Sequence, residues 1–197
     1  MSDFINTIDI KDDEDIFNEL VTRTIVEFRD NVIQSIGNNA FAYCYDLELI
    51  DLPNSTSVGS SAFASCAKLN TINIPMVKTI GSQAFFTAKI TYINLPSVIT
   101  IAANAFKQCI NLTKIDMNTC ELKQYAFTES ALNTVIIRGA TVAKLGTNNV
   151  FSKTPLEEGN GYIYVPAALV DSYKSATNWS VFADQIRAIE DYPDICG

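Results

Sequence analysis

The feature that most constrains this chain is a block of about twenty residues that is written nearly the same way several times. Residues 36–53, "IGNNAFAYCYDLELIDLP", return 22 residues later as "VGSSAFASCAKLNTINIP". Aligned on an Ala-Phe or Val-Phe pair, successive units place Phe41, Phe63, Phe85, Phe106, Phe127 and Phe151 at intervals of 22, 22, 21, 21 and 24 residues. A fixed period of this size is typical of solenoid folds.

Each unit has two parts with different patterns. The second part, Leu-x-x-Ile-x-Leu, alternates with a period of two and predicts a short strand with one buried face. The first part, around Ala-Phe, is too short for a long helix and favours a helical turn on the opposite side. One unit cannot bury its own apolar face, but stacked units can. The sequence therefore predicts continuous columns of Phe over Phe and Leu over Leu.

The units "IGNNAFAYCYDLELIDLP", "VGSSAFASCAKLNTINIP", "IGSQAFFTAKITYINLP", "IAANAFKQCINLTKIDM" and "LKQYAFTESALNTVII" resemble BspA-type leucine-rich repeats. The resemblance covers residues 32–156 and implies a leucine-rich-repeat solenoid, a right-handed α/β superhelix that is rich in β structure. It implies a parallel sheet on one face and short helical turns on the other. Because the fifth unit lacks both Ile-Gly and Cys and the sixth carries insertions, we expect distortion there.

The chain outside the repeats predicts a cap at each end, because an open terminal coil would expose apolar columns and strand edges. Residues 1–31 are expected to form the N-terminal cap, residues 32–156 five to six repeats of 21–24 residues, and residues 157–197 the last strand and a helical C-terminal cap, all in one structural domain. In the first cap, "TRTIVEF" predicts a leading strand, and Ile16, Phe17, Leu20, Val21 and Ile25 are spaced for one face of a turn or short helix. Residues 163–191 resemble the segment that closes many such arrays. Two short amphipathic helices are predicted after Pro166, with apolar faces formed by Ala167, Leu169, Val170 and Tyr173, then by Trp179, Phe182 and Ile186.

Charge and hydropathy limit the partners. The net charge of −8 is divided into 9 acids and 3 bases in residues 1–31, 6 and 9 in residues 32–156, and 7 and 2 in residues 157–197. This balance argues against nucleic acid or an anionic membrane as the main partner. No apolar run reaches the roughly 18–20 residues of a membrane helix, and the N-terminus lacks a secretory signal pattern.

We therefore expect a cytoplasmic or virion-associated protein, or alternatively one that reaches the cell surface or is secreted by a non-classical route. The glycosylation-type triplets at Asn54, Asn111 and Asn178 are then chance matches.

The composition predicts no enzyme. The chain has no His, which removes Ser-His-Asp and Cys-His catalysis. Of five Cys, three lie three residues after a repeat Phe: Cys44, Cys66 and Cys109. Since the equivalent positions elsewhere hold Ser130 and, one residue early, Thr87, we interpret this position as a small buried side chain whose weak donor meets a backbone carbonyl. An odd number of free thiols also favours a reducing compartment.

The carboxylates also predict neither a metal site nor a catalytic site. The acidic run at Asp9, Asp12, Asp13, Glu14 and Asp15 lacks the glycine of a calcium loop and suits the charges of a solvated cap. Asp51 and Asp116 occupy matching repeat positions three coil steps apart, roughly 14 Å, which is too far for glycoside hydrolysis. There is also no glycine-rich phosphate loop. We expect no catalytic residue, no metal and no cofactor.

The candidate functional region is the outward face of the predicted sheet. If Ile and Leu of each strand point inward, the residues between them form two outward columns. One column contains Leu49, Thr71, Tyr92, Lys114, Thr134 and Tyr162, and the other contains Asp51, Asn73, Asn94, Asp116, Ile136 and Tyr164. The structural repeat core is expected to contain Phe41, Cys44, Phe63, Cys66, Phe85, Phe106, Cys109 and Phe127.

Exposed tyrosines beside polar groups are typical of recognition patches, so Tyr92, Tyr162, Tyr164 and Lys114 are the strongest candidates. The same columns also suit an ordinary solvated face with an Asp/Asn ladder. Two functions stay open. The first is a non-catalytic module that binds a protein or glycan, on a virion or cell surface, without nucleic acid or membrane insertion. The second is a purely structural component of a larger particle with no free ligand.

Overall fold

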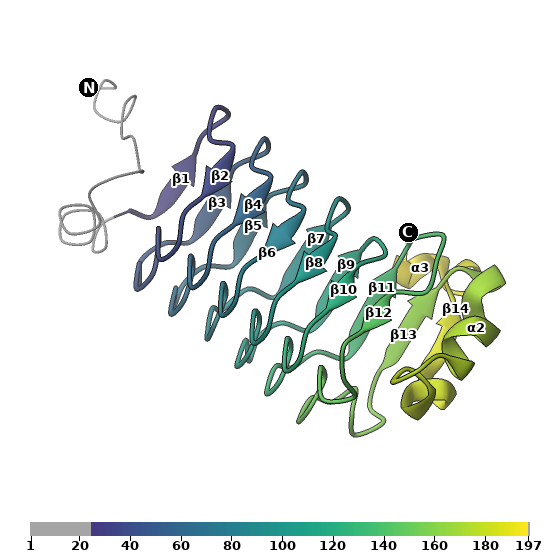
Figure 1. Ribbon diagram of the computed structural model, residues 1–197. Helices are drawn as coiled ribbons and strands as arrows, with labels where there is room; N and C mark the ends of the chain where they lie inside the picture. Colours follow the sequence, from purple (N-terminus) through teal and green to yellow (C-terminus); the bar gives the residue numbers. More distant parts are fainter. Residues whose placement is uncertain (1–24, 197) are drawn as a thin grey trace.

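The computed structural model describes residues 25–196, which form a parallel β-solenoid of about seven turns (Figure 1). The predicted solenoid class is confirmed. Ile25 packs against the core of the first coil. The other predicted N-terminal cap residues and the acidic run lie outside the described residues.

The Leu-x-x-Ile-x-Leu segments form the longer strands, which we call the long-strand sheet. It has two parts, with all pairs parallel. The first part contains β1 (Glu27–Arg29), β3 (Leu49–Asp51) and β5 (Thr71–Asn73). The second contains β7 (Tyr92–Leu95), β9 (Lys114–Met117), β11 (Thr134–Ile137), β13 (Tyr162–Val165) and β14 (Ile186–Ala188). β1 includes Glu27 and Phe28 of the predicted leading strand, and residues 22–24 of that segment lie outside the described residues.

The division between β5 and β7 does not fall where distortion was predicted. It falls between the strands of the second and third repeats. In the third repeat the segment from Phe85 to Ile90, which leads into β7, is one residue shorter than the segment from Phe63 to Leu69. At the irregular fifth and sixth repeats, β11 pairs with both β9 and β13. The insertions there are accommodated outside the sheet.

A second sheet, the short-strand sheet, was not predicted. Its strands are β2 (Ser35–Ile36), β4 (Ser57–Val58), β6 (Thr79–Ile80), β8 (Thr100–Ile101), β10 (Glu121–Leu122) and β12 (Lys144–Leu145). Each has one outward residue followed by a buried branched aliphatic residue. Two residues are too few to show a period of two, which is why the sequence pattern did not reveal them.

The Ala-Phe segments are not helical turns. In each of the first five repeats, two residues four positions apart lie in the left-handed region, as at Asn39 (φ 57°) and Tyr43 (φ 63°). Their N–H groups, and that of Phe41 between them, donate to carbonyls of the next coil at 2.7–2.9 Å. A helical turn would direct these donors along its own coil, whereas this conformation continues the hydrogen bonding along the solenoid axis. The ladder offsets the cost of left-handed backbone at non-glycine residues.

The Ile-Gly steps bring neighbouring coils very close. A Cβ atom built on Gly59 would lie 2.5 Å from the carbonyl carbon of Gly37, and one on Gly81 would lie 2.6 Å from that of Gly59. These distances are shorter than real Cβ contacts, so glycine is required for this approach.

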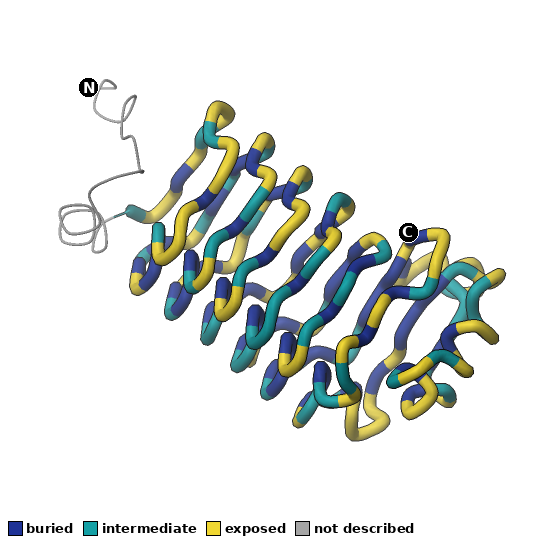
Figure 2. Tube along the Cα trace, in the orientation of Figure 1, coloured by how far each residue is buried: buried dark blue, intermediate teal, exposed yellow. Residues whose placement is uncertain are grey.

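Phenylalanine rings fill the centre of the solenoid. Rings from Phe41 to Phe151 stack in sequence at centroid distances of 5.3, 5.2, 5.0, 5.2 and 5.6 Å, with interplanar angles of 3–13°. All six are 0–1% exposed. Buried segments recur at the same place in successive coils (Figure 2). The predicted phenylalanine core is confirmed.

The repeat cysteines are structural thiols. Cys66 Sγ donates to the carbonyl of Phe41 at 3.1 Å, and Cys109 Sγ donates to that of Phe85 at 2.9 Å. Cys44 is also buried, and all five cysteines are free. Burial raises the pKa of Cys120 to about 12 and raises the pKa of Cys66 and Cys109, so these thiols stay protonated at neutral pH.

The proposed equivalence of Thr87 is wrong. Ala88 lies three residues after Phe85 and is fully buried there. Thr87 instead lies on the outer edge of the turn, where its Oγ1 is 3.2 Å from Ser65 Oγ.

The last coil is covered by a compact C-terminal cap. It contains the 3₁₀ turn η1 (Ala167–Leu169), helix α2 (Val170–Ser175), and the 3₁₀ helix η2 (Ser180–Gln185), then β14, the 3₁₀ turn η3 (Ile189–Asp191) and the single turn α3 (Pro193–Cys196). The second predicted amphipathic helix is therefore a 3₁₀ helix, and Ile186 belongs to a strand instead. Ala167 is exposed, while Leu169 and Val170 pack against the core.

Polar side chains of the cap satisfy backbone groups of the last coils. Trp179 Nε1 donates to the carbonyl of Ala143 at 2.7 Å, and the N–H of Ala143 donates to the Tyr173 hydroxyl at 2.8 Å. The Phe182 ring meets the Phe151 ring edge-on at 5.6 Å. The cap thus ends both the hydrogen-bond ladder and the phenylalanine column.

Replacing Phe85 by Ala should lower the free energy of unfolding by about 3–5 kcal/mol, because it opens a cavity between two stacked rings. The control is Lys78→Ala on the exposed surface, which should change stability by less than about 0.5 kcal/mol. Chemical denaturation monitored by circular dichroism would measure both. Equal stability of the Phe85 variant and the parent would contradict the stacked core.

Ser130 occupies the cysteine position of the fifth repeat, and its buried Oγ has no hydrogen-bond partner among the described residues. Ser130→Cys should reach the carbonyl of Phe106 as the other repeat thiols reach theirs. We expect a gain of about 1 kcal/mol, or a rise in Tm of roughly 2–4 °C. Ser130→Ala serves as the comparison in the same thermal melts. Destabilisation by Ala would show that the hydroxyl is satisfied, and equal melting of the two variants would show that the thiol bond adds nothing.

Candidate recognition surface

The outward side chains of the long-strand sheet form the two predicted columns, which we call the sheet face. In the first part of the sheet, Leu49 pairs with Thr71 and Asp51 with Asn73. In the second part, Tyr92, Lys114, Thr134 and Tyr162 are in register, as are Asn94, Asp116, Ile136 and Tyr164. The sequence therefore located the columns correctly, except that β5 and β7 are not bonded to one another.

The N-terminal part of the face is accessible to solvent, and we call it the open half. It contains Leu49, Asp51, Thr71, Asn73, Tyr92 and Asn94, each exposed or half-buried. Tyr92 is 43% exposed as a residue, and Lys114 Nζ lies 5.6 Å from the centroid of its ring, within the range of a cation–π contact. An aromatic ring and a cation are thus held side by side at the edge of this half.

Polar side chains link neighbouring strands of the open half. Asn73 Nδ2 donates to Asp51 Oδ1 at 2.8 Å, and Arg29 binds the other carboxylate oxygen at 3.2 Å. This is a short ladder of the predicted Asp/Asn type, with Arg29 as an additional member. These hydrogen bonds link the outward side chains of three neighbouring strands.

The Asp116 position differs from the Asp51 position. Its carboxylate accepts two parallel hydrogen bonds from Arg138, Nε to Oδ1 at 2.8 Å and Nη2 to Oδ2 at 2.7 Å. The Asp116 side chain is only 9% exposed. The bond to Asp116 is the main reason that the pKa of Arg138 is raised.

The expectation that the second column faces solvent throughout is wrong for its C-terminal members. Asp116, Ile136 and Tyr164 are all buried, Ile136 completely. We call this region, together with Lys114 and Arg138, the covered half. Burial raises the pKa of the Tyr164 phenol, as expected for a group removed from water.

The cover is the chain's own Ile189–Cys196, which we call the C-terminal segment. Cys196 is buried against Ile136 and Tyr164, and the Tyr192 ring meets the Tyr164 ring at 5.3 Å. Lys114 Nζ donates to the carbonyl of Ile195 at 2.7 Å, and Arg138 donates to the carbonyl of Cys196. Figure 1 shows α3 beside the last strands.

Tyr162 stays exposed at the far end of its column. Its ring lies 4.7 Å from the guanidinium of Arg187, which β14 brings opposite Tyr164. This second aromatic–cation contact is separated from Tyr92 by β9 and β11. The tyrosines that the sequence grouped together therefore occupy three environments: Tyr92 open, Tyr162 at the end and Tyr164 covered.

A hollow of about 370 Å³ lies where the two halves meet. Its lining residues are Tyr92, Asn94, Pro96, Asp116, Met117, Asn118 and Arg138. It combines an aromatic ring, two primary amides and an ion pair, which suits neutral polar groups that both donate and accept hydrogen bonds.

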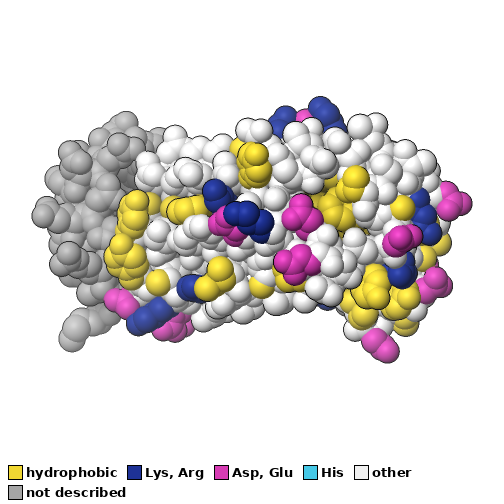
Figure 3. Space-filling model, turned by 90° about the horizontal axis from the view of Figure 1, so that it is seen from below, with side chains coloured by type: hydrophobic (Ala, Val, Ile, Leu, Met, Phe, Trp, Pro, Cys, Tyr) yellow, Lys and Arg dark blue, Asp and Glu magenta, His cyan; other side chains and the backbone are white. Residues whose placement is uncertain are grey.

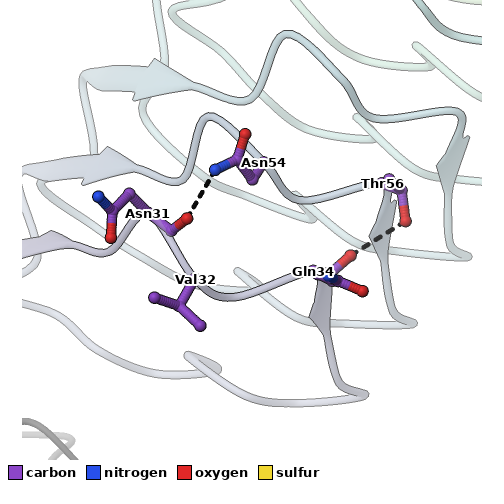
Figure 4. A pocket seen from close by; sticks show the side chains of 5 residues that line it. All are labelled: Asn31, Val32, Gln34, Asn54 and Thr56. Carbon is purple, nitrogen blue, oxygen red and sulfur yellow. Dashed lines mark hydrogen bonds between the residues drawn. The ribbon is translucent and has the colours of Figure 1, made fainter.

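Other surfaces are less organised for binding. A hollow near the first coils is lined by Asn31, Val32, Gln34, Asn54 and Thr56 (Figure 4). Its Asn54 and Thr56 side chains already donate to carbonyls of the preceding coil. On the side shown in Figure 3, hydrophobic side chains form separate small groups and charges of opposite sign lie close together.

The described residues contain no cluster of three or more His, Cys, Asp or Glu side chains that could hold a metal ion. None of the helices within residues 25–196 is long and apolar enough to cross a membrane. Asp116 is occupied by Arg138, and β5 and β7 separate it from Asp51.

Comparison with known proteins agrees with this architecture. The family model for the BspA type leucine-rich repeat region matches residues 15–157 with six copies. The chain belongs to this family. No curated protein matches it.

Two solved structures are similar to this repeat protein. One is a leucine-rich repeat protein from Bacteroides ovatus ATCC 8483, with 25% identity and a TM-score of 0.52 over 72% of this chain and 39% of that one. The other is the pneumococcal vaccine antigen PcpA, with 16% identity and a TM-score of 0.63 over 83% of this chain and 40% of that one. The chain thus spans about two fifths of each.

Sequence reasoning missed Arg29, Arg138 and the C-terminal segment. Arg138 continues the alternation of Thr134 and Ile136, so its side chain belongs to the same face. A fully apolar Ile136 in an otherwise polar column was itself a signal that another segment covers the sheet.

Arg138→Ala should lower the free energy of unfolding by about 2–3 kcal/mol, because it leaves the nearly buried Asp116 carboxylate unpaired. The matched control is Arg29→Ala at the exposed Asp51 pair, with an expected loss below about 1 kcal/mol. Urea denaturation of both variants provides the measurement. Equal losses at the two sites would contradict the difference in burial.

Proposed function

We propose that this repeat protein is a non-catalytic module that binds a protein partner through the open half of its sheet face. The observation that carries the proposal is the row of exposed polar side chains that ends at the exposed ring of Tyr92 and the neighbouring hollow. Amphipathic tyrosine beside fixed hydrogen-bonding groups is the composition of recognition sites in proteins.

The geometry supports recognition of a peptide segment. Asn73 and Asn94 present amides, which both donate and accept, at the same position of their strands. Asp51 with Arg29 adds charges of both signs at the N-terminal end of the half. Because Arg29, Asp51 and Asn73 are already hydrogen-bonded to one another, these side chains lose less freedom when a partner docks, which reduces the entropic cost of binding.

Family membership supports an interaction role, since leucine-rich repeats generally mediate protein interactions. The structural alternative, assembly in a larger particle without a free ligand, makes a different prediction for an isolated chain. It requires that the open half bind no separate peptide.

Selection of displayed random peptides on the immobilised parent protein would test the proposal. Peptides that bind should lose at least about tenfold in affinity, equivalent to 1.4 kcal/mol, when Asn73 and Tyr92 are both changed to Ala. Thr79→Ala on the short-strand sheet is the control and should leave the affinity unchanged. Failure to select any peptide, or equal binding by both variants, would reject the proposal. A glycan array in parallel would reassign the ligand class if a glycan bound in place of peptides.

A further inference from the structure

The covered half of the sheet face is occupied by the chain's own C-terminal segment. We infer that this part of the sheet is a peptide-binding site, filled in this structure by the chain's own C-terminal segment, and that a partner protein binds there with a segment of the same chemistry. The inference rests on the proposed function only for the class of partner, because it extends protein recognition from the open half to the covered half.

The covered half has the anatomy of a protein-binding site. Its centre is apolar, with Ile136 fully buried and the Tyr164 ring beside it. Charged side chains lie beside this centre, with Lys114 and Asp116 on β9 and Arg138 directly after β11. A buried apolar and aromatic centre within a polar rim is the arrangement found where proteins recognise one another.

The bound segment is recognised through a small number of features. Its backbone turn is closed internally, by hydrogen bonds from the N–H groups of Ile195 and Cys196 to the carbonyl of Tyr192. That turn places Tyr192 and Cys196 four positions apart, on one side, against Tyr164 and Ile136. Its last carbonyls accept hydrogen bonds from Lys114 and Arg138.

The C-terminal segment is joined to the rest of the protein mainly through side chains. Within residues 25–196, each hydrogen bond between the segment and the sheet strands involves a side chain of the sheet. A further bond joins the N–H of Ala167 to Glu190 Oε2 at 2.9 Å. Pro193, Asp194 and Ile195 are exposed on the outer side. The segment therefore lies on the surface and does not form a layer of the core.

These contacts define the partner. It is a protein segment that forms a single helical turn, with an aromatic residue followed four positions later by a small apolar residue. Carbonyls at the end of that turn would replace those of Ile195 and Cys196. Since tethering gives the chain's own segment an effective concentration of the order of millimolar, a free peptide competes poorly unless the segment is released.

Titration of a fluorescent synthetic peptide of residues 186–196 into full-length chains under reducing conditions tests the inference. The release variant carries Tyr192→Ala and Cys196→Asp, which remove both anchors and leave the sheet face intact. We expect this variant to bind the peptide at least about tenfold more tightly than the parent. Asp194→Ala, an exposed change in the same segment, is the matched control and should bind as weakly as the parent.

Arg138→Ala in the release variant should weaken peptide binding by about tenfold, because a charge-assisted hydrogen bond to the peptide is lost. Circular dichroism would confirm folding, and if the release variant unfolds, Tyr192→Ala alone decides by the same titration. No gain on release, or no dependence on Arg138, would overturn the inference. Self-association of the release variant in light scattering, without peptide binding, would assign the surface to contacts between copies and would also overturn it.

Failure here is distinguishable from failure of the proposed function. Displayed peptides that lose affinity on the single change Asn73→Ala report on the open half, because β5 belongs to a different part of the sheet from β9 and β11. Loss of the fluorescent peptide with retention of those peptides would reject only the site in the covered half.

Discussion

Stacking of each phenylalanine ring on the next is the interaction on which the solenoid depends. The centroid distances of 5.0–5.6 Å are close to the spacing of about 4.8 Å between parallel strands. The stacked rings and the paired strands can therefore advance by nearly the same distance along the solenoid axis with each coil. Because every coil contributes its ring at the same place, the strands, the turn ladders and the Cys66 and Cys109 thiols come into register as a consequence. The outward side chains of the sheet face line up in columns because the coils beneath them repeat in register.

The same dependence explains what the sequence could predict. Phe spacing and the alternation in Leu-x-x-Ile-x-Leu report directly on buried positions, so the core and the long strands were predictable. The short-strand sheet has two residues per coil and leaves no periodic pattern. Residues such as Asn39 and Tyr43 adopt left-handed backbone without the glycine that usually signals it. Thr87 was misplaced because a one-residue deletion in the third repeat can be aligned in two ways.

The exposure of a surface side chain could be predicted only where it depends on residues that are close in the sequence. Alternation along one strand suffices to place Asn73 or Tyr92 on the outer face. The burial of Ile136 depends instead on residues far along the chain, since Arg138 and Cys196 are separated by 58 positions and Lys114 and Ile195 by 81. No local pattern carries such a contact. The division of one uniform face into an open and a covered half is therefore a tertiary property, and it is the property on which the two binding proposals depend.

The C-terminal segment contacts side chains of β9 and of the residue that follows β11. Because of this attachment, the length of the open half can change without a change in the place where the accessible face ends. The segment is anchored by Lys114 and Arg138, on the C-terminal side of β7. A coil inserted before β7 would lengthen the open half by about 4.8 Å and leave those anchors in place. The number of coils before β7 therefore sets the length of the open half. The C-terminal segment sets the position at which the accessible surface ends.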